Sequence, residues 1–362
     1  MKKTYNFSAG PAVLPRKVLE VVQHELLNYK GSGMSVMELS HRSSLYQDIH
    51  NETKHLLKSL LNLNDDFEIL FIQGGASLQF TMIPLNFAKD KIGYYIDGGT
   101  WGKRAIEEAN IINPKHTVCL ASGESSNYTK IPATPEIPND GAYLHITTNN
   151  TIEGTTLYEL PQTNLPLIAD MSSNILSVDY DYNQFDLIYA GAQKNLGPAG
   201  VCVVAVKKQL LQTINHTLPS MLDYRVYKDN DSLFNTPPTF SIYMLREVLK
   251  WVKDLGGVKA MEKRAKQKAN LLYDTLDQSK LFDTPVKGKD RSLNNIPFYT
   301  QSDALNKCFL KEAEALGLLN LKGHRLVGGM RASIYNAMPL EGVKALCDFI
   351  NTFEKEHLHA QD

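Results

Sequence analysis

A carboxylate and an amine, two groups that can act together in chemistry, stand where short apolar segments end. Asp170 directly follows the apolar residues 167–169, and Lys194 follows another apolar run at 187–190. Lys194 lies in the segment 190–200, AGAQKNLGPAG, whose small residues let backbone or a ligand approach closely. Partial desolvation would lower the pKa of this lysine and free its amine to attack a carbonyl. Taken singly, Asp170 could be a helix-capping or turn aspartate, and Lys194 could be a solvated loop lysine.

Two expected strand-to-helix junctions offer the remaining parts of a ligand site. The first, Gly74-Gly75-Ala76-Ser77, presents amides and a hydroxyl that could hold a phosphate at a positive helix end. At the second, Trp101 follows two glycines, where its ring could stack on a flat ligand, although a core position is the usual one for tryptophan. Pyridoxal phosphate requires a lysine for its aldehyde, a carboxylate for its pyridine nitrogen, an aromatic face and a phosphate cradle. Together these residues predict a site for that cofactor.

Other signatures of catalysis are incomplete in this sequence. The segment 31–36 lacks the third glycine of a dinucleotide-binding loop, and 75–79 ends in Gln79 where a nucleophile elbow has glycine. The segment 24–28 lacks the second histidine of a zinc-binding helix. Hydride transfer, serine hydrolysis and zinc hydrolysis therefore have no support. The four cysteines have no metal-ligand spacing, so no metal site is expected; they are Cys119, Cys202, Cys308 and Cys347.

Apolar segments that alternate with helical patterns must position these residues. Several segments are apolar throughout, which is typical of strands buried on both faces of a largely parallel sheet. The sequence therefore predicts an α/β fold. A boundary is expected at Gly256-Gly257, which would end a helix over about 242–252, and the charged residues 262–268 would form a solvated helix face. The expected strands include residues 69–72, 94–96, 143–146, 167–169, 187–190 and 201–206.

Composition excludes several classes of protein. The 362 residues are 43% hydrophobic and 21% charged, which argues against disorder, collagen and coiled coil. The net charge of −1 implies no general attraction to nucleic acid or to an anionic membrane. No apolar run approaches the roughly 18 residues of a spanning helix, and no signal peptide is expected. We therefore expect a cytoplasmic protein.

The sequence resembles the phosphoserine aminotransferases, in the class V group of fold-type I pyridoxal phosphate enzymes. The resemblance covers essentially the whole chain and implies a mostly parallel central sheet in a large domain, residues 15–257. A smaller α+β domain would comprise residues 1–14 and 258–362. The segments that carry the resemblance are NFSAGP at 6–11, SVMELSHR at 35–42, the loop 190–200, FNTPPTF at 234–240 and GHRLVGGMRAS at 323–333.

The resemblance also assigns the cofactor site. Lys194 would form the internal aldimine with pyridoxal phosphate, and Asp170 would pair with the pyridine nitrogen. Trp101 would stack on the ring, and Thr151 would contact the cofactor from one side. Two further residues would come from a second subunit, which implies a homodimer with shared active sites. The residues implied to hold the phosphate are Ala76, Ser77 and Gln193, with Asn235 and Thr236 of the partner subunit.

The implied reaction moves an amino group between L-glutamate and 3-phosphonooxypyruvate, giving O-phospho-L-serine and 2-oxoglutarate, a step of serine biosynthesis. Use of 4-phosphooxythreonine in vitamin B6 synthesis stays open. Arg42 and Arg331 would bind substrate carboxylate or phosphate, with added positive charge from His41, His324 and Arg325. Such an arginine and histidine cluster can accept both anions, since guanidinium groups match either one.

Two departures and two alternatives accompany this interpretation. Some family members carry Gly-Arg at the position of Ala76-Ser77, so this chain lacks one cationic phosphate ligand that they have. Some carry serine at the position of Ala9, so this chain also lacks one possible substrate contact. A cysteine desulfurase usually has histidine before the cofactor lysine and histidine on the ring, where this chain has Gln193 and Trp101. A non-catalytic small-molecule binding protein would leave Lys194 and Asp170 without a role.

Overall fold

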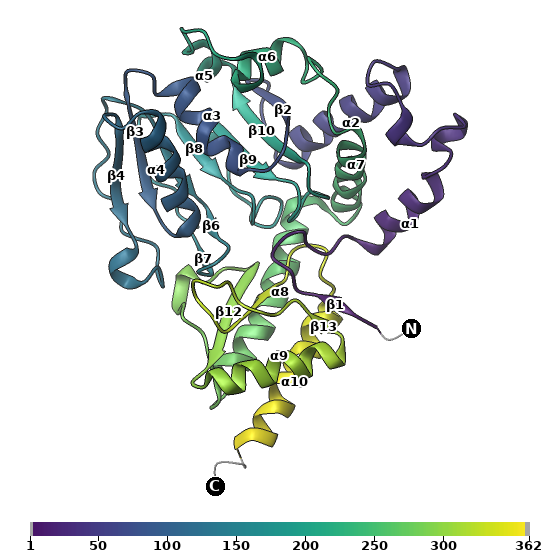
Figure 1. Cartoon of the computed structure of the whole chain (residues 1–362), viewed down its shortest axis with the longest axis vertical. Helices are drawn as coiled ribbons and strands as arrows, with labels where there is room; N and C mark the ends of the chain where they lie inside the picture. The colour runs from purple at the N-terminus through teal and green to yellow at the C-terminus, as the bar shows by residue number, and fades with distance from the viewer. Residues whose placement is uncertain (1–2, 359–362) are drawn as a thin grey trace.

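A seven-stranded sheet forms the centre of the larger part of the molecule, in a computed structural model that describes residues 3–358 (Figure 1). Neighbouring strands run parallel, except that β10 pairs antiparallel with both β2 and β9. All six expected strand segments lie in this sheet, so the prediction of a mostly parallel α/β fold is confirmed. The order across the sheet is β2 (Phe67–Gln73), β10 (Val201–Lys207), β9 (Leu187–Gly191), β8 (Leu167–Asp170), β5 (Gly141–Thr147), β3 (Ile92–Asp97) and β4 (Thr117–Ser122).

Both faces of the sheet are buried, which explains why its strands are apolar at successive positions. On β2, Ile69 and Phe71 face one hydrophobic core, whereas Leu70 and Ile72 face another. Each fully buried side chain of this size contributes roughly 1.5–3 kcal/mol. The first core includes residues of α2 (Ser44–Leu60) and α7 (Thr239–Asp254), and the second includes residues of α3 (Ser77–Phe87) and α4 (Thr100–Ile112).

The C-terminal third forms a second, smaller sheet with its own helices, below the large sheet in Figure 1. Its three strands are antiparallel, in the order β11 (Phe282–Asp283), β12 (Asn295–Thr300) and β14 (Met330–Ser333). The helices α8 (Gly257–Gln278), α9 (Asp303–Leu316) and α10 (Leu340–Leu358) pack with it. The N-terminal strand β1 (Tyr5–Asn6) pairs parallel with β13 (Leu318–Leu319), so both ends of the chain contribute to this part. Residues 1–2 and 359–362 of the expected small domain lie outside the described residues.

Shorter elements complete the chain. The expected end of a helix before Gly256-Gly257 is confirmed: α7 ends at Asp254, and the amide of Gly256 donates to the carbonyl of Lys253. Gly256 has φ +102°, a left-handed conformation that favours glycine. The remaining α-helices and β-strands are α1 (Arg16–Glu25), α5 (Lys208–Gln212), α6 (Tyr224–Asp229), β6 (Asn149–Asn150) and β7 (Thr155–Thr156).

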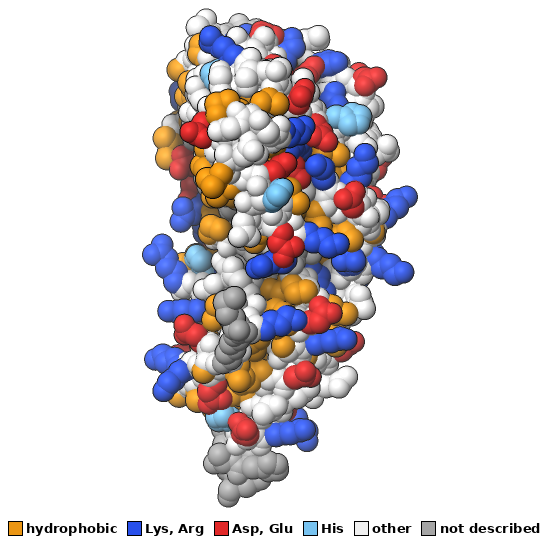
Figure 2. Space-filling view, turned by 90° about the vertical axis from the view of Figure 1, so that its right-hand side faces the viewer, with side chains coloured by type: hydrophobic (Ala, Val, Ile, Leu, Met, Phe, Trp, Pro, Cys, Tyr) orange, Lys and Arg blue, Asp and Glu red, His pale blue; other side chains and the backbone are white. Residues whose placement is uncertain are grey.

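The surface carries both signs of charge. Figure 2 shows acidic and basic side chains interspersed on the face that it presents, as expected for a net charge of −1. Among residues 3–358, no helix combines the length and the apolar character that crossing a bilayer requires.

The charged run 262–268 is a solvated helix face at most of its positions, but Lys268 is an exception. This lysine of α8 is 3% exposed, and its Nζ donates to the carbonyls of Ile334, Tyr335 and Met338 at 2.9, 2.6 and 3.1 Å. Burial, with repulsion from Arg264, lowers the pKa of this amine to about 7. The three carbonyls replace the water hydrogen bonds that the amine gives up, and they join α8 to the chain between β14 and α10.

Replacing Lys268 tests how much this buried contact stabilises the fold. In Lys268→Met the side chain keeps its length, but three buried carbonyls lose their donor, which should lower the free energy of unfolding by about 1–3 kcal/mol. The control, Lys263→Met on the exposed face of the same helix, should change it by less than about 0.5 kcal/mol. Urea unfolding of both variants measures the difference, and equal effects would contradict a structural role for Lys268.

Candidate active site

The predicted site residues gather at one edge of the large sheet. Asp170 is the last residue of β8, Lys194 follows β9 by three positions, and Thr151 directly follows β6, just beyond the end of β5. Trp101 lies in the first turn of α4, after β3. Because β9, β8, β5 and β3 are parallel neighbours, their carboxyl ends meet at this edge, where ligands bind in such folds.

Lys194 is held in place by contacts from two of these segments. Its Nζ donates to Thr151 Oγ1 at 2.7 Å and lies 5.8 Å from the centre of the Trp101 ring. Although part of the side chain reaches the surface, burial of the amine lowers its pKa to about 8. Asp170 raises this pKa and Arg331 lowers it further. The lowered pKa agrees with the expected desolvation of Lys194, and its role as a nucleophile stays a prediction.

Asp170 is a buried carboxylate, 6% exposed, whose Oδ1 accepts a hydrogen bond from the amide of Ser172 at 2.8 Å. Burial raises the pKa of Asp170, while Lys194, Ser172 and the hydroxyl of Tyr189 oppose that rise. The Tyr189 hydroxyl also bonds to His145 Nε2 at 2.9 Å, and burial lowers the pKa of His145 to about 3, so that this histidine is neutral. A ligand cation at this site would therefore meet the carboxylate of Asp170, whose neutral hydrogen-bond donors are Ser172 and Tyr189.

Tyr189 was missed by the sequence reasoning, which treated its strand only as a source of apolar packing. Its place in β9 gives a signal in retrospect, because a polar group inside a fully buried strand requires a partner. Two positions later, the absence of a side chain at Gly191 leaves room for Gln193 and Ala76 to approach each other. A Cβ at Gly191 would lie 2.8 Å from Gln193 Oε1 and 3.4 Å from the Cβ of Ala76.

The expected phosphate-binding residues are thus partly assembled in the single chain. Ala76 and Ser77 begin α3, after Gly74, whose φ of +105° favours glycine. Gln193 reaches the same place from the other side, as the spacing around Gly191 shows. Asn235 Nδ2 donates to Gln73 Oε1 at 3.0 Å, at the end of β2 in its own chain, and the neighbouring Thr236 is exposed. Contact of Asn235 and Thr236 with the site of a second subunit stays a prediction.

Arg331 connects the smaller sheet to the catalytic edge. It lies in β14, and its Nη1 donates to the backbone carbonyl of Thr151 at 3.2 Å. Thr151 therefore contacts Lys194 through its hydroxyl and Arg331 through its carbonyl. Burial lowers the pKa of the Arg331 guanidinium, and Glu153 opposes this effect. A partly buried cation with one weak partner is suited to binding an anion.

Three arginines lie near enough to His324 to affect its pKa. Burial lowers the pKa of His324, and the positive charges of Arg331, Arg325 and Arg104 lower it further. The structure thus brings together three of the expected substrate-binding residues. Arg104 was not expected: it stands in α4 three residues after Trp101, so one helix face presents both residues.

The loop that carries His324 and Arg325 depends on glycine. The amide of Gly323 donates to the carbonyl of Gly329 at 2.9 Å, which closes the loop. A Cβ at Gly323 would lie 1.9 Å from the carbonyl oxygen of Gly328, so a larger residue would force the loop open. The motif at 323–329 is therefore needed to form this turn.

His41 and Arg42 have no contact with the assembled residues that the structure shows among residues 3–358. They precede α2, where Gln47 Nε2 donates to the backbone carbonyl of His41 at 3.0 Å, and Arg42 is exposed. Among residues 3–358, no hydrogen bond or ion pair joins either side chain to Lys194 or Arg331. Their role in binding substrate stays a prediction.

The N-terminal segment covers the Lys194 loop. The amide of Ala12 donates to the carbonyl of Gln193 at 2.8 Å, and Tyr335 holds the carbonyl of Ala9 at 2.8 Å. A Cβ at Gly10 would lie 3.4 Å from Gln193 Cγ and 3.7 Å from Lys194 Cγ. The NFSAGP motif therefore packs directly against the segment that carries Lys194.

Comparison with known proteins agrees with this geometry. The profile of the aminotransferase class-V family matches residues 4–346. A curated phosphoserine aminotransferase of Listeria monocytogenes is 54% identical over 353 residues, 98% of this chain and 97% of the relative. A solved phosphoserine aminotransferase, studied for radiation damage of its Schiff base, shares 49% identity and covers 98% of this chain and 100% of its own, with a TM-score of 0.96. A pyridoxal-phosphate-bound phosphoserine aminotransferase of Trichomonas vaginalis shares 37% identity over 96% of this chain and 100% of its own, with a TM-score of 0.92. The chain therefore belongs to the aminotransferase class-V family and, within it, to the phosphoserine aminotransferases.

Proposed function

We propose that this chain catalyses the reversible transfer of an amino group between L-glutamate and 3-phosphonooxypyruvate, giving O-phospho-L-serine and 2-oxoglutarate. The observation that carries this proposal is the Lys194 amine, whose pKa is lowered to about 8, beside buried Asp170 and within reach of Arg331. A simple binding protein would have no use for this nucleophile. A cysteine desulfurase is disfavoured because Gln193 and Trp101 replace its usual histidines, and because the relatives compared are phosphoserine aminotransferases.

The residues present fit pyridoxal phosphate. The Nε1 atom of Trp101 is buried and has no hydrogen-bond partner among the described residues, so this ring lies at a space that a ligand could share. Lys194 offers an amine that is neutral more often than an ordinary lysine, and Asp170 offers a carboxylate for a pyridine nitrogen. Ala76 and Gln193 converge at Gly191, where the N-terminus of α3 favours a phosphate.

The mechanism assigns two proton-handling roles to this chain. When bound, pyridoxal phosphate supplies an electron sink for the electrons left at the substrate Cα after proton loss. Asp170 would hold a proton at the pyridine nitrogen, because its carboxylate is buried and stabilised by Ser172 and Tyr189. Lys194 would remove the Cα proton and deliver it to the reacting carbon, as general base and then acid. Thr151 would orient the amine through the 2.7 Å hydrogen bond.

The cations would bind the two anionic ends of each substrate. Arg331, fixed by Thr151, would hold the α-carboxylate that glutamate and phosphoserine share. His324 and Arg325 would face the distal carboxylate or phosphate, with His41 and Arg42 completing the pocket. The same pocket would accept the phosphate of 4-phosphooxythreonine, and assaying that compound beside phosphoserine decides whether it is a substrate.

A homodimer would complete the site. Phe234 is 51% exposed beside Asn235 and Thr236, and Leu326 is 64% exposed beside Arg325. Large apolar side chains exposed next to expected ligand-binding residues are suited to burial at a subunit interface. Each subunit would thereby bring Asn235 and Thr236 to the site of the other, while Leu326 would be buried at the edge of the interface. We also propose cytoplasmic location and division of the chain into a large domain, residues 15–257, and a small domain formed by 1–14 and 258–362.

The first test concerns the residue that carries the cofactor. Lys194→Ala should reduce turnover by roughly 10²- to 10⁴-fold or more, because both the covalent attachment and the general base are lost. Borohydride reduction and peptide mass spectrometry should place the cofactor on Lys194 in the wild type and find no adduct in the variant. Lys263→Ala, at an exposed lysine, serves as control; an adduct on any other lysine would refute the assignment.

A second test uses Asp170→Asn, which keeps the shape of the side chain but removes its charge. Cofactor should still bind, while kcat falls steeply because the pyridine proton is no longer held by a carboxylate. Asp170 raises the pKa of Lys194, so the pH midpoint for cofactor attachment to the apoprotein should move below about 8 in this variant. Normal kcat with an unmoved midpoint would leave Asp170 only a turn residue.

A third test separates the two ends of the substrate. Arg331→Ala should lower kcat/KM for glutamate and phosphoserine alike, by about 10- to 100-fold for the loss of one charged hydrogen-bonding partner. Arg325→Ala should affect phosphoserine more, because a phosphate carries about −1.5 to −2 and a carboxylate −1. Arg264→Ala, on the exposed face of α8, is the control. Equal losses for both substrates in Arg325→Ala would show that Arg325 does not distinguish the distal groups.

A further inference from the structure

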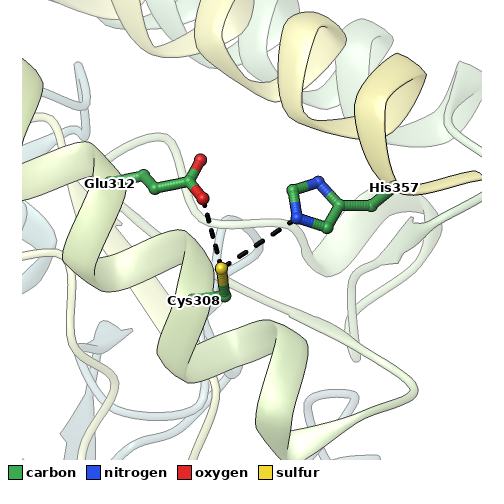
Figure 3. A group of neighbouring side chains, drawn as sticks. All are labelled: Cys308, Glu312 and His357. Atoms are coloured by element: carbon green, nitrogen blue, oxygen red, sulfur yellow. Dashed lines mark hydrogen bonds between the residues drawn. The ribbon is translucent and has the colours of Figure 1, made fainter. Parts of the chain in front are cut away.

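Three side chains with metal-binding atoms converge at the end of the smaller part of the molecule. Cys308 and Glu312 are one turn apart on α9, and His357 lies in the last turn of α10 (Figure 3). Cys308 Sγ is 3.2 Å from Glu312 Oε1 and 4.0 Å from His357 Nε2. All three ligand atoms lie within 4.8 Å of one another. The three residues are partly buried, so an ion from solvent can reach them.

The imidazole of His357 is oriented as a metal ligand requires. Its Nδ1 lies 2.9 Å from the carbonyl oxygen of Phe353, and the ring stacks on that of Phe353 with centres 3.9 Å apart. A carbonyl can only accept, so the proton is on Nδ1 and the lone pair of Nε2 faces Cys308. Histidines that bind metals are fixed in this way, by a hydrogen bond from the other ring nitrogen.

We propose that Cys308, Glu312 and His357 form a binding site for Zn²⁺ or another divalent transition metal ion of similar softness. Bonds of about 2.3 Å to sulfur and about 2.0–2.2 Å to nitrogen and oxygen place the ligand atoms of a tetrahedral site roughly 3.3–3.7 Å apart. The observed 3.2 and 4.0 Å fall on either side of this range, and the third separation is at most 4.8 Å, so the side chains would have to draw together around the ion. Thiolate and imidazole ligands disfavour Mg²⁺ and Ca²⁺, which prefer oxygen.

Coordination would form a sulfur–metal bond and release the thiol proton of Cys308 to solvent. Water would occupy the fourth position. Because Glu312 belongs to α9 and His357 to α10, the ion would join the last turn of α10 to its neighbour. The C-terminal end of α10, which carries His357, lies at the far end of the smaller part from the large sheet (Figure 1), so we expect the ion to have no part in amino transfer.

Cobalt binding to the holoenzyme tests the site, since Co²⁺ can report tetrahedral thiolate ligation. Chelator-treated holoenzyme titrated with Co²⁺ should develop visible d–d bands beyond the absorption of the cofactor, saturating at one ion per chain and displaced by Zn²⁺. Cys308→Ser should weaken Zn²⁺ binding by more than the roughly 10- to 100-fold that loss of an outer partner costs. Cys119→Ser, at an exposed cysteine elsewhere, should leave it unchanged.

A second variant keeps the packing while removing the nitrogen ligand. His357→Phe retains a ring against Phe353 and should lose Zn²⁺ affinity as Cys308→Ser does, with transamination unchanged. In the wild type, Zn²⁺ should also slow hydrogen exchange in the last turn of α10. Absence of the cobalt bands, or unchanged Zn²⁺ affinity in either variant, would overturn the proposal and leave a hydrogen-bonded cluster without a metal.

Discussion

The burial of an amine and a carboxylate at one edge of the sheet is the constraint on which the active site depends. Water is largely excluded from Lys194 and Asp170, so each of them shifts the pKa of the other. Burying such groups costs free energy unless protein partners replace the hydrogen bonds that water made to them. Thr151 and Ser172 replace part of that water, and the surrounding strands hold these partners in position.

The strand ends alone do not complete this environment. Arg331 arrives from a separate sheet late in the chain, and its charge lowers the pKa of Lys194. Its hydrogen bond to Thr151 makes that residue a partner of both Lys194 and Arg331, the proposed nucleophile and the proposed substrate-binding cation. Movement of the smaller sheet relative to the larger one would therefore change both the binding of an anion and the reactivity of the amine. In the proposed mechanism, substrate binding by Arg331 and proton transfer by Lys194 would therefore be coupled through Thr151.

The sequence allowed the sheet and the central pair to be predicted because their causes are local. Strands buried on both faces must be apolar throughout; Asp170 ends one such strand, and Lys194 follows another by three residues. Arg104 and Lys268 could not be assigned in this way, since their roles depend on which distant segment packs against their helix. The spacing of the cysteines likewise did not indicate the proposed metal site at Cys308, because the histidine ligand, His357, comes from another helix. Features that depend on neighbouring residues could be predicted from the sequence, whereas partners that tertiary packing brings together could not.

The pairing of β1 with β13 has a consequence for synthesis on the ribosome. Tyr5 is matched to Leu318, so the first strand cannot find its partner until nearly the whole chain has emerged. The segment that follows β1 packs on the Lys194 loop, which means that the large sheet can form before its active-site cover is anchored. Contacts between such distant positions are slow to form because a long loop must be closed. During synthesis, the central sheet can therefore form while Lys194 is still open to the surroundings.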